Sequence, residues 1–317
     1  MSPPVRIGVL GTGRIGAMHA ELLARRVPGA ALAVVYDAVP ESADRLGAPV
    51  ARSVEDVLSS PAVDAVAVCS STDTHVDLVV AAAEAGKAIF CEKPLSLDLD
   101  EVDRALAAVE RAGVLLQIGF NRRFDPGHRA VRNAVAAGEV GDVHILRITS
   151  RDPAPPPLDY IAVSGGLFLD MTIHDFDMAR FVTGSEVVEV YARGAVRVDP
   201  AIGEAGDVDT AVVTLAHENG ALTAIDNSRR AVYGYDQRVE AFGSKGVVLS
   251  ENPAPMPHFF LDRYEPSYIA EWEAFVAAVR SGGPSPVPGA DGRAPLMIGL
   301  AARRSGRAGR LVRIAEV

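Results

Sequence analysis

Asp170, His174 and Asp177 form the pattern in this chain with the clearest capacity for chemistry. Their spacing of i, i+4 and i+7 predicts that all three project from one face of a helix that follows Gly165-Gly166 and runs to about Val182, with Gly184 as its C-cap. A carboxylate beside an imidazole can orient the ring and raise its basicity, so such a pair could accept a proton. The same residue types could ligate zinc or iron, and the polar face of an ordinary helix would look no different.

A second pattern with chemical meaning is Gly11-Thr12-Gly13-Arg14-Ile15-Gly16, which follows the β-rich run Val5–Leu10 and precedes residues with helical spacing. Strand, Gly-x-Gly-x-x-Gly and helix together are the context of a dinucleotide-binding turn. The first glycine forms the turn, the second lets the backbone approach a pyrophosphate, and the third lets helix and strand pack closely. We expect the pyrophosphate at the N-terminus of this helix, beside Arg14 and Ile15.

Asp37 ends the second predicted strand, 21 residues after Gly16. An acid at that place accepts hydrogen bonds from the adenosine ribose hydroxyls. Its charge would repel a 2′-phosphate, and the residues that follow, Ala38-Val39-Pro40, include no arginine to bind one. The sequence therefore favours NAD over NADP.

The alternation of strand and helix continues to about residue 120 and predicts a doubly wound parallel sheet, a Rossmann domain spanning residues 1–120. Ligands of such sheets gather beyond the carboxyl ends of the strands. The polar residues that follow predicted strands, and are therefore expected near the cofactor, are Ser70, Thr72, His75, Glu92 and Lys93. An ammonium group at Lys93 could bind a substrate hydroxyl and stabilise the alkoxide that precedes hydride loss.

Residues 121–317 break this rhythm and form the second predicted domain, an α+β unit. Short strands separated by turn sequences such as Asn219-Gly220 predict a mainly antiparallel open sheet. One face of an open sheet must be covered, and a second subunit is a common cover. We expect a homodimer or homotetramer formed through this sheet.

At this point the chain resembles the Gfo/Idh/MocA oxidoreductase family over essentially its whole length. The motifs that carry the resemblance are Gly11-x-Gly13-x-x-Gly16, Glu92-Lys93-Pro94, the segment 119–125 (Gly-Phe-Asn-Arg-Arg-Phe-Asp) and Asp170-x-x-x-His174. Segments 150–156 and 230–238 are most similar to the inositol 2-dehydrogenase branch. The resemblance implies NAD-dependent oxidation of a cyclic polyol to a ketone, with myo-inositol giving 2-keto-myo-inositol. Another cyclitol, an aminocyclitol or a pyranose is the alternative substrate.

The family resemblance also implies roles for individual residues. Lys93, Asp170 and His174 would be catalytic: His174 would take the hydroxyl proton, Asp170 would orient it or bind an adjacent hydroxyl, and Lys93 would polarise the reacting oxygen. Side chains that would join these three in binding the polyol are Arg123, Asp152 and Tyr235. Asp177 receives no role, and no metal is expected, because Lys93 in the same site would repel a cation. A non-catalytic dinucleotide-binding regulator is the alternative of a different class.

Composition limits what else the protein could do. The chain of 317 residues has a net charge of −10, which argues against a nucleic-acid surface. We expect no signal peptide and no membrane span, because no apolar run approaches the roughly 20 residues that a bilayer requires. Cys69 and Cys91 form no disulfide framework, and we expect reduced thiols in a cytoplasmic protein.

Overall fold

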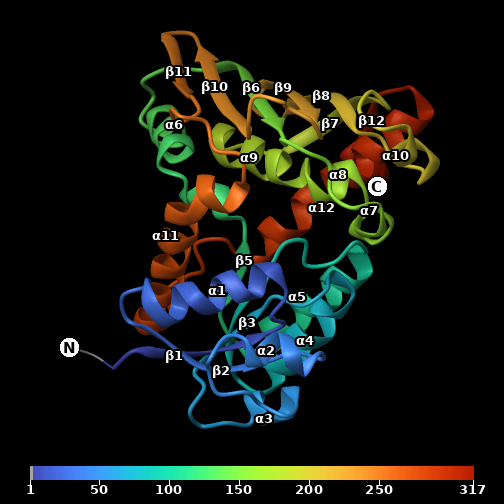
Figure 1. Ribbon diagram of the computed structural model, residues 1–317. Coiled ribbons are helices and arrows are strands. Elements are labelled where there is room, and N and C mark those ends of the chain that lie inside the picture. The colour runs from blue at the N-terminus through green and yellow to red at the C-terminus, as the bar shows by residue number, and fades with distance from the viewer. Residues whose placement is uncertain (1–2) are drawn as a thin grey trace. The chain divides into compact units, whose positions relative to one another are not determined.

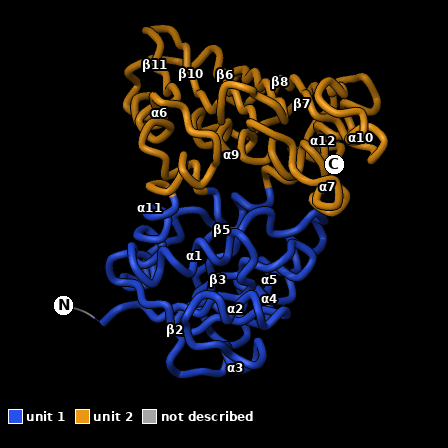
Figure 2. The backbone as a smooth tube through the Cα atoms, in the orientation of Figure 1, with its two compact units in different colours: residues 1–120, 268–293 blue, residues 121–267, 294–317 orange. Residues whose placement is uncertain are grey.

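The computed structural model describes residues 3–317, which divide into two compact units (Figure 2). Unit 1 comprises the chain up to Phe120 together with Tyr268–Arg293, and unit 2 comprises Asn121–Ser267 together with Ala294–Val317. The polypeptide therefore passes from one unit to the other three times.

Unit 1 is built on a five-stranded parallel sheet with the order β2-β1-β3-β4-β5. Its strands are β1 (Val5–Leu10), β2 (Ala30–Tyr36), β3 (Ala65–Val68), β4 (Ala88–Glu92) and β5 (Leu116–Gly119). Its helices within the first 120 residues are α1 (Arg14–Arg25), α2 (Pro40–Asp44), α3 (Val54–Leu58), α4 (Thr72–Glu84) and α5 (Leu99–Ala112). Strands β3 and β5 are buried along their whole length, as strands covered on both faces are. The predicted doubly wound parallel sheet is confirmed.

The segment 268–293 packs with unit 1, whereas the sequence analysis assigns it to the second domain. The reason is aromatic packing: the rings of Trp272 and Phe90 stack with their centroids 4.3 Å apart, and Phe275 meets Trp272 edge to face. Two helices cross the division between the units, α11 (Phe260–Ser281) and α12 (Gly289–Ala308). The sequence does not mark either crossing, because apolar residues at helical spacing do not reveal which of the two cores a helix packs against.

Unit 2 is built on a seven-stranded sheet with the order β11-β10-β6-β9-β8-β7-β12. Its strands are β6 (Val143–Arg151), β7 (Val187–Ala195), β8 (Thr210–His217), β9 (Leu222–Ser228), β10 (Asp236–Gly243), β11 (Gly246–Ser250) and β12 (Val312–Arg313). Its helices besides those that cross the division are η1 (Asn121–Phe124), α6 (Pro126–Ala136), α7 (Leu158–Ser164), α8 (Leu167–Asp170), α9 (Ile173–Thr183), α10 (Pro200–Glu204) and η2 (Ile314–Glu316). Only the central pair β6–β9 is parallel, so the mainly antiparallel sheet is confirmed.

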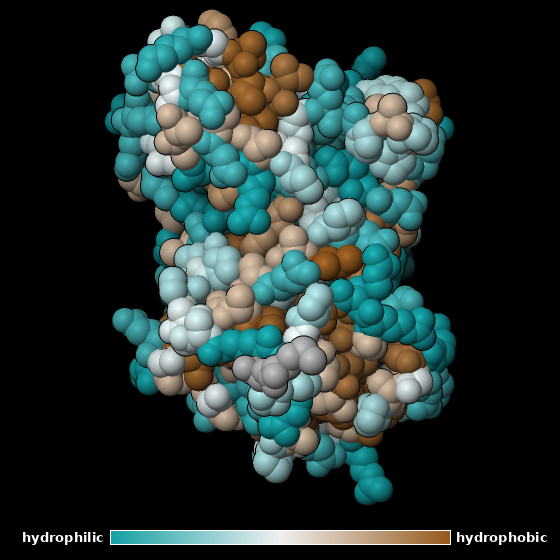
Figure 3. Space-filling view, turned by 90° about the vertical axis from the view of Figure 1, so that its left-hand side faces the viewer, coloured by the Kyte–Doolittle hydropathy of each residue, from teal (hydrophilic) through white to brown (hydrophobic). Residues whose placement is uncertain are grey.

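The two faces of the unit 2 sheet differ. On one face, Leu146, Ile148 and Val213 are buried in a core that also contains Phe176 of α9, and Figure 1 shows α6, α9 and α12 beneath the strands. The opposite face carries an exposed apolar row, whose members are paired in register across β9, β6, β10 and β11: Leu222, Ile145, Phe242 and Val247. Figure 3 shows hydrophobic atoms gathered near the top of unit 2, where Figure 1 shows strands of this sheet.

The prediction of a single helix from Gly165-Gly166 to about Val182 is wrong. The structure has two helices, α8 and α9, separated at Met171-Thr172. The Thr172 N–H donates to the Leu167 carbonyl oxygen, five residues back, and the Thr172 hydroxyl donates to Asn227 of β9 over 2.7 Å. Asp170 and His174 therefore belong to different helices, Asp170 as the last residue of α8 and His174 as the second residue of α9. The predicted C-cap is confirmed, since Gly184 is left-handed with φ 62°.

Candidate active site

Each of the three glycines in the turn between β1 and α1 occupies its position for a different physical reason. Gly11 has φ +91°, and a Cβ there would meet the Ser70 nitrogen at 2.4 Å. A Cβ on Gly16 would lie 1.9 Å from the Gly11 oxygen, so the turn and helix could not close. A Cβ on Gly13 would meet nothing within 4 Å, which leaves this backbone open to an approaching group. That accessible backbone at the N-terminus of α1, which starts at Arg14 and Ile15, fits a dinucleotide pyrophosphate.

Asp37 lies directly after β2 and is tied to the glycine turn. Its Oδ2 accepts hydrogen bonds from the Thr12 backbone N–H at 2.5 Å and the Thr12 hydroxyl at 3.0 Å, and its Oδ1 accepts from the Val39 N–H at 2.8 Å. Burial opposes ionisation, but these hydrogen bonds outweigh it and lower the pKa of Asp37. The carboxylate is therefore ionised at neutral pH and disfavours a phosphate beside it.

Three polar residues after β3 surround the start of α4. The Ser70 hydroxyl lies 2.6 Å from the Thr74 hydroxyl, and Thr72 is the first residue of α4. His75 is buried, with its Nδ1 2.9 Å from the Pro94 carbonyl oxygen and its Nε2 3.0 Å from the Ser70 carbonyl oxygen. Burial lowers the pKa of His75. The ring connects the ends of β3 and β4, so its contacts are structural.

Glu92, the last residue of β4, is held by a chain of buried donors. The Trp272 indole N–H donates to His19 Nδ1 over 2.8 Å, which leaves His19 Nε2 protonated to donate to Glu92 Oε1 over 2.8 Å. Glu92 Oε2 accepts from the Lys93 backbone N–H at 3.1 Å. His19 and Trp272 thus position the Glu92-Lys93 corner. Sequence reasoning missed both, because they lie 253 residues apart.

Lys93 follows β4 directly, and its peptide bond to Pro94 is cis. The side chain is half-buried. It is therefore placed beyond the carboxyl end of a central parallel strand, the edge at which ligands of doubly wound sheets bind.

Asp170 and His174 lie on α8 and α9 of unit 2, and both are half-buried. The Tyr160 hydroxyl donates to Asp170 Oδ1 over 2.9 Å, and Arg229 Nη1 lies 3.6 Å from Asp170 Oδ2. Each oxygen of this carboxylate therefore faces a different donor group, which fixes its orientation.

The beginning of α9 is fastened to the sheet by a buried network that sequence reasoning missed. Asp175 Oδ1 accepts from Arg122 Nη1 at 2.8 Å, and Asp175 Oδ2 accepts from Asn227 Nδ2 at 2.8 Å. Burial raises the pKa of Asp175 to about 6, against the opposing effect of Arg122. The residue after His174 is thereby held in place from β9 and η1. The Gly-Phe-Asn-Arg-Arg motif was the available signal, but it does not reveal the partner of either arginine.

Asp152 follows β6 and is half-buried. Its backbone is fixed, since its N–H donates to the Ser228 oxygen at 2.9 Å and its carbonyl oxygen accepts from the Ala231 N–H at 2.6 Å. Burial raises the pKa of its carboxyl group to about 6; the nearby arginines lower it, and neighbouring carboxylates raise it. A carboxylate with these properties can accept a hydrogen bond from a polar ligand.

Tyr235 and Arg123, the other predicted substrate residues, are both buried. Arg122 Nη2 donates to the Tyr235 hydroxyl over 3.4 Å, and burial raises the pKa of Tyr235. Arg123 forms a bidentate ion pair with Asp177, whose Oδ1 and Oδ2 lie 2.5 and 2.8 Å from Arg123 Nη2 and Nε. Asp177 is therefore directed at η1.

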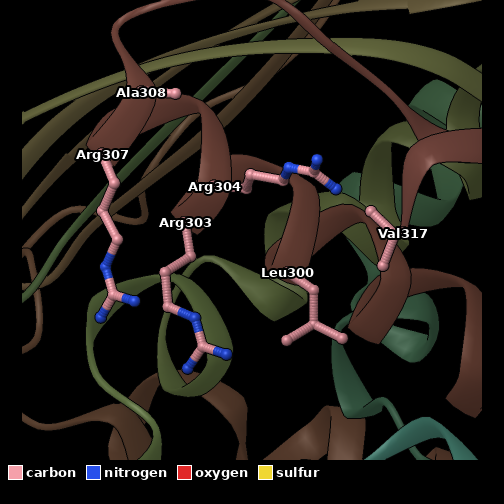
Figure 4. A pocket seen from close by; sticks show the side chains of 6 residues that line it. All are labelled: Leu300, Arg303, Arg304, Arg307, Ala308 and Val317. Carbon is pink, nitrogen blue, oxygen red and sulfur yellow. The ribbon is translucent and has the colours of Figure 1, made fainter.

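None of the predicted site residues lines the cavity in unit 2 that Figure 4 shows. Its volume is about 500 Å³, and its lining residues are Leu300, Arg303, Arg304, Arg307, Ala308 and Val317. Among residues 3–317, no three His, Cys, Asp or Glu side chains gather as a possible metal site. In that same part of the chain, no helix combines the length and apolar content needed to cross a bilayer.

Comparison with known families covers both units. Residues 5–120 match the oxidoreductase family with an NAD-binding Rossmann fold, and residues 128–249 match the GFO/IDH/MocA C-terminal domain.

Individual relatives extend over the full chain. The myo-inositol 2-dehydrogenase of Thermotoga maritima is 51% identical, with 99% of each chain covered. A crystal structure of a myo-inositol dehydrogenase from Corynebacterium glutamicum is 41% identical, with a TM-score of 0.92 and 98% of each chain covered. The scyllo-inositol dehydrogenase of Lactobacillus casei, solved with NAD(H) and scyllo-inositol, is 28% identical, with a TM-score of 0.90, and the match covers 98% of this chain and 99% of that one.

Proposed function

The chain belongs to the GFO/IDH/MocA family of NAD-binding oxidoreductases, and from this membership we propose that it oxidises myo-inositol to 2-keto-myo-inositol. The observation that carries the substrate is the 51% identity, over 99% of the chain, to a myo-inositol 2-dehydrogenase. The alcohol carbon loses a hydride and its hydroxyl loses a proton, so the protein must supply a proton acceptor and stabilise the oxygen from which the proton leaves.

We assign these tasks to three side chains. His174 accepts the hydroxyl proton, because a neutral imidazole is the side-chain base available near neutral pH. The Lys93 ammonium polarises the reacting oxygen and stabilises the developing alkoxide. Asp170, whose two oxygens face Tyr160 and Arg229, orients the substrate through an adjacent hydroxyl.

NAD, when bound, takes up the hydride at its nicotinamide ring. The groups of unit 1 that fit it are the accessible Gly13 backbone at the start of α1 and the ionised Asp37 carboxylate. Ser70, Thr72 and Glu92 lie at the carboxyl ends of β3 and β4, where cofactors of this fold bind. In unit 2, we propose that Asp152 accepts and Tyr235 donates hydrogen bonds to polyol hydroxyls.

We further propose that two copies associate through the open face of the unit 2 sheet, in a homodimer or as part of a homotetramer. The paired row Leu222, Ile145, Phe242 and Val247 leaves apolar surface that an identical row can cover. Phe242→Glu should halve the mass measured by light scattering, from dimer to monomer or from tetramer to dimer; an unchanged mass would place the interface elsewhere. The two unpaired, buried cysteines, Cys69 and Cys91, support a cytoplasmic location.

The experiment is NAD reduction monitored by NADH absorbance with myo-inositol, its scyllo and chiro isomers, aminocyclitols and pyranoses. We expect the highest kcat/KM with myo-inositol. A higher value with scyllo-inositol would reassign the stereoisomer. Tight NAD binding without turnover of any member of the panel would replace the proposal with a non-catalytic regulator.

A further inference from the structure

Arg229 is a buried cation that the proposed chemistry does not use. It follows β9 directly, its side chain is 1% exposed, and its backbone N–H donates to the Asp209 carbonyl oxygen at 2.8 Å. Its guanidinium Nη1 lies 3.6 Å from Asp170 Oδ2, and its Nη2 lies 3.9 Å from Asp207 Oδ2. Both distances suit an ion pair but exceed a hydrogen bond.

The guanidinium of Arg229 lacks the hydrogen bonds that buried arginine side chains usually make. Among residues 3–317, Nε and Nη2 have no hydrogen-bond partner. A buried donor without a hydrogen-bond partner destabilises the folded state, and more so when it is charged. A site selected for stability alone would replace such a group with a well-packed apolar side chain. The cost points to a role in the nearby chemistry.

Asp207 shows what the second ion pair does. Its Oδ1 and Oδ2 accept hydrogen bonds from the backbone N–H of Leu167, at 3.2 and 2.9 Å, and Leu167 is the first residue of α8. A Cβ on Gly166, which has φ +80°, would lie 2.6 Å from Asp207 Oδ1, so the chain approaches this carboxylate closely. Asp207 thus fixes the start of α8, and Asp170 is the last residue of the same helix.

We propose that Arg229 is a positioning residue that holds the two ends of α8, through Asp207 and Asp170, and thereby sets the Asp170 carboxylate in the polyol site. A four-residue helix after two glycines has little stability of its own, because helix nucleation is unfavourable. A cation between the carboxylates at its two ends supplies the restraint. This role rests on the proposed function, since Asp170 is proposed there to orient the polyol.

Arg229 also acts on a further carboxylate of unit 2. Its charge lowers the pKa of Asp152, as does that of Arg122, while Asp170 and Asp175 raise it. Asp226 of β9 is a further charged group of this network, since it raises the pKa of Asp175. Loss of the Arg229 charge should raise the pKa of Asp152 and move any pH dependence that Asp152 sets to higher pH.

The test uses Arg229→Gln, Arg229→Lys and Asp207→Asn in the full-length protein, with Arg180→Gln as control. Arg180 is an arginine of α9 paired with Glu186 at 2.6 Å and is not part of the proposed site. We expect Arg229→Gln to lower kcat with myo-inositol about 100-fold and Arg229→Lys about 10-fold, with the dissociation constant for NAD unchanged. The acidic limb of the pH dependence of the myo-inositol KM should shift to higher pH in Arg229→Gln, and Arg180→Gln should change neither quantity.

A double-mutant cycle separates positioning from general destabilisation. If Arg229 acts through Asp207 on α8, Asp207→Asn should add little to the loss of kcat in Arg229→Gln. The proposal would be overturned if the losses of kcat in the two single variants multiply in the double variant. It would also be overturned if kcat and the pH profile of KM in Arg229→Gln equal those of the wild type. If Arg229→Gln does not fold, Arg229→Lys, which keeps the charge, replaces it in the cycle.

A crystal structure of Arg229→Gln distinguishes this inference from the proposed function. Positioning predicts that the Asp170 carboxylate moves away from the Tyr160 hydroxyl, with or without turnover. Wild-type protein that is inactive on every polyol, with Asp170 displaced in the variant, would remove the proposed function and keep the positioning role. Wild-type protein that is active, with Asp170 unmoved in the variant, would keep the proposed function and remove the positioning role.

Discussion

The backbone N–H of Thr12 donates a hydrogen bond to Asp37 Oδ2 over 2.5 Å, so the residue that directly follows β2 also holds the turn between β1 and α1. In the proposed NAD site, the carboxylate that shapes the glycine turn would also face the adenosine ribose. We therefore expect substitutions at Asp37 to change cofactor preference and turn geometry together.

Replacing Asp37 with Ser and Ala38 with Arg should shift preference from NAD towards NADP. The change removes the charge that repels a 2′-phosphate and supplies a cation for it. Because the Thr12 hydrogen bonds are weakened too, kcat/KM with NAD should fall by more than kcat/KM with NADP rises. Asp64→Asn is the control, since Asp64 pairs with Arg6 on the surface. A ratio of the two kcat/KM values equal to that of the wild type would mean that the ribose is recognised elsewhere.

Replacing His174 with Gln should flatten the acidic limb of the pH dependence of kcat. A base acts only when it is deprotonated, so kcat of the wild type should rise with pH until His174 has lost its proton. Without the imidazole, kcat should be about 100-fold to 10,000-fold lower and should no longer follow that titration. His144→Gln, on β6, is the matched control. Persistence of the limb in the His174 variant would assign the proton to another group.

Asp152 should make polyol binding, rather than the chemical step, depend on pH. Burial raises the pKa of its carboxyl group to about 6, so the ionised acceptor is lost as the pH falls through that value. The KM for myo-inositol should therefore rise below about pH 6 in the wild type. Asp152→Asn should have a raised KM that is constant across this range. A wild-type KM that is constant from pH 5 to 8 contradicts the role.

Asp177→Asn tests whether Arg123 binds substrate or supports the fold. The bidentate Arg123–Asp177 pair is buried, and breaking such a pair costs about 3–5 kcal/mol because a charge is left uncompensated. We expect a clearly lowered midpoint of thermal unfolding, with the KM for myo-inositol within about twofold of wild type at a temperature where the variant is folded. A large increase in KM without loss of stability would return Arg123 to the substrate site.

The Rossmann half of the fold was predictable because its signals are local. Gly11, Gly13 and Gly16 lie in one turn, and the buried strand β3 is an uninterrupted apolar run. The break between α8 and α9 was not, since it depends on a hydrogen bond from Thr172 to Asn227, 55 residues away. The same holds for the pair Arg122–Asp175, which spans 53 residues.

The candidate site was predictable to a similar degree. Lys93, Asp170 and His174 were predicted from motif resemblance, and residues that pack around them, such as Tyr160 and Arg229 beside Asp170, were not. Arg229 is the first of two adjacent arginines in the sequence, and it is buried near the carboxylates of Asp170, at the end of α8, and Asp207, between α10 and β8. Long-range ion pairs of this kind leave no trace in spacing or composition.

The most direct test of the central claim is hydride transfer from carbon 2 of myo-inositol to NAD. Wild-type protein, NAD and myo-inositol carrying deuterium at carbon 2 would be incubated together, and the NADH would be analysed by mass spectrometry. We expect NADH heavier by one mass unit and 2-keto-myo-inositol in equal amount, whereas Lys93→Met, with NAD affinity retained, should form neither at a comparable rate. NADH without deuterium, or no NADH at all from the wild type, would rule out this hydride transfer.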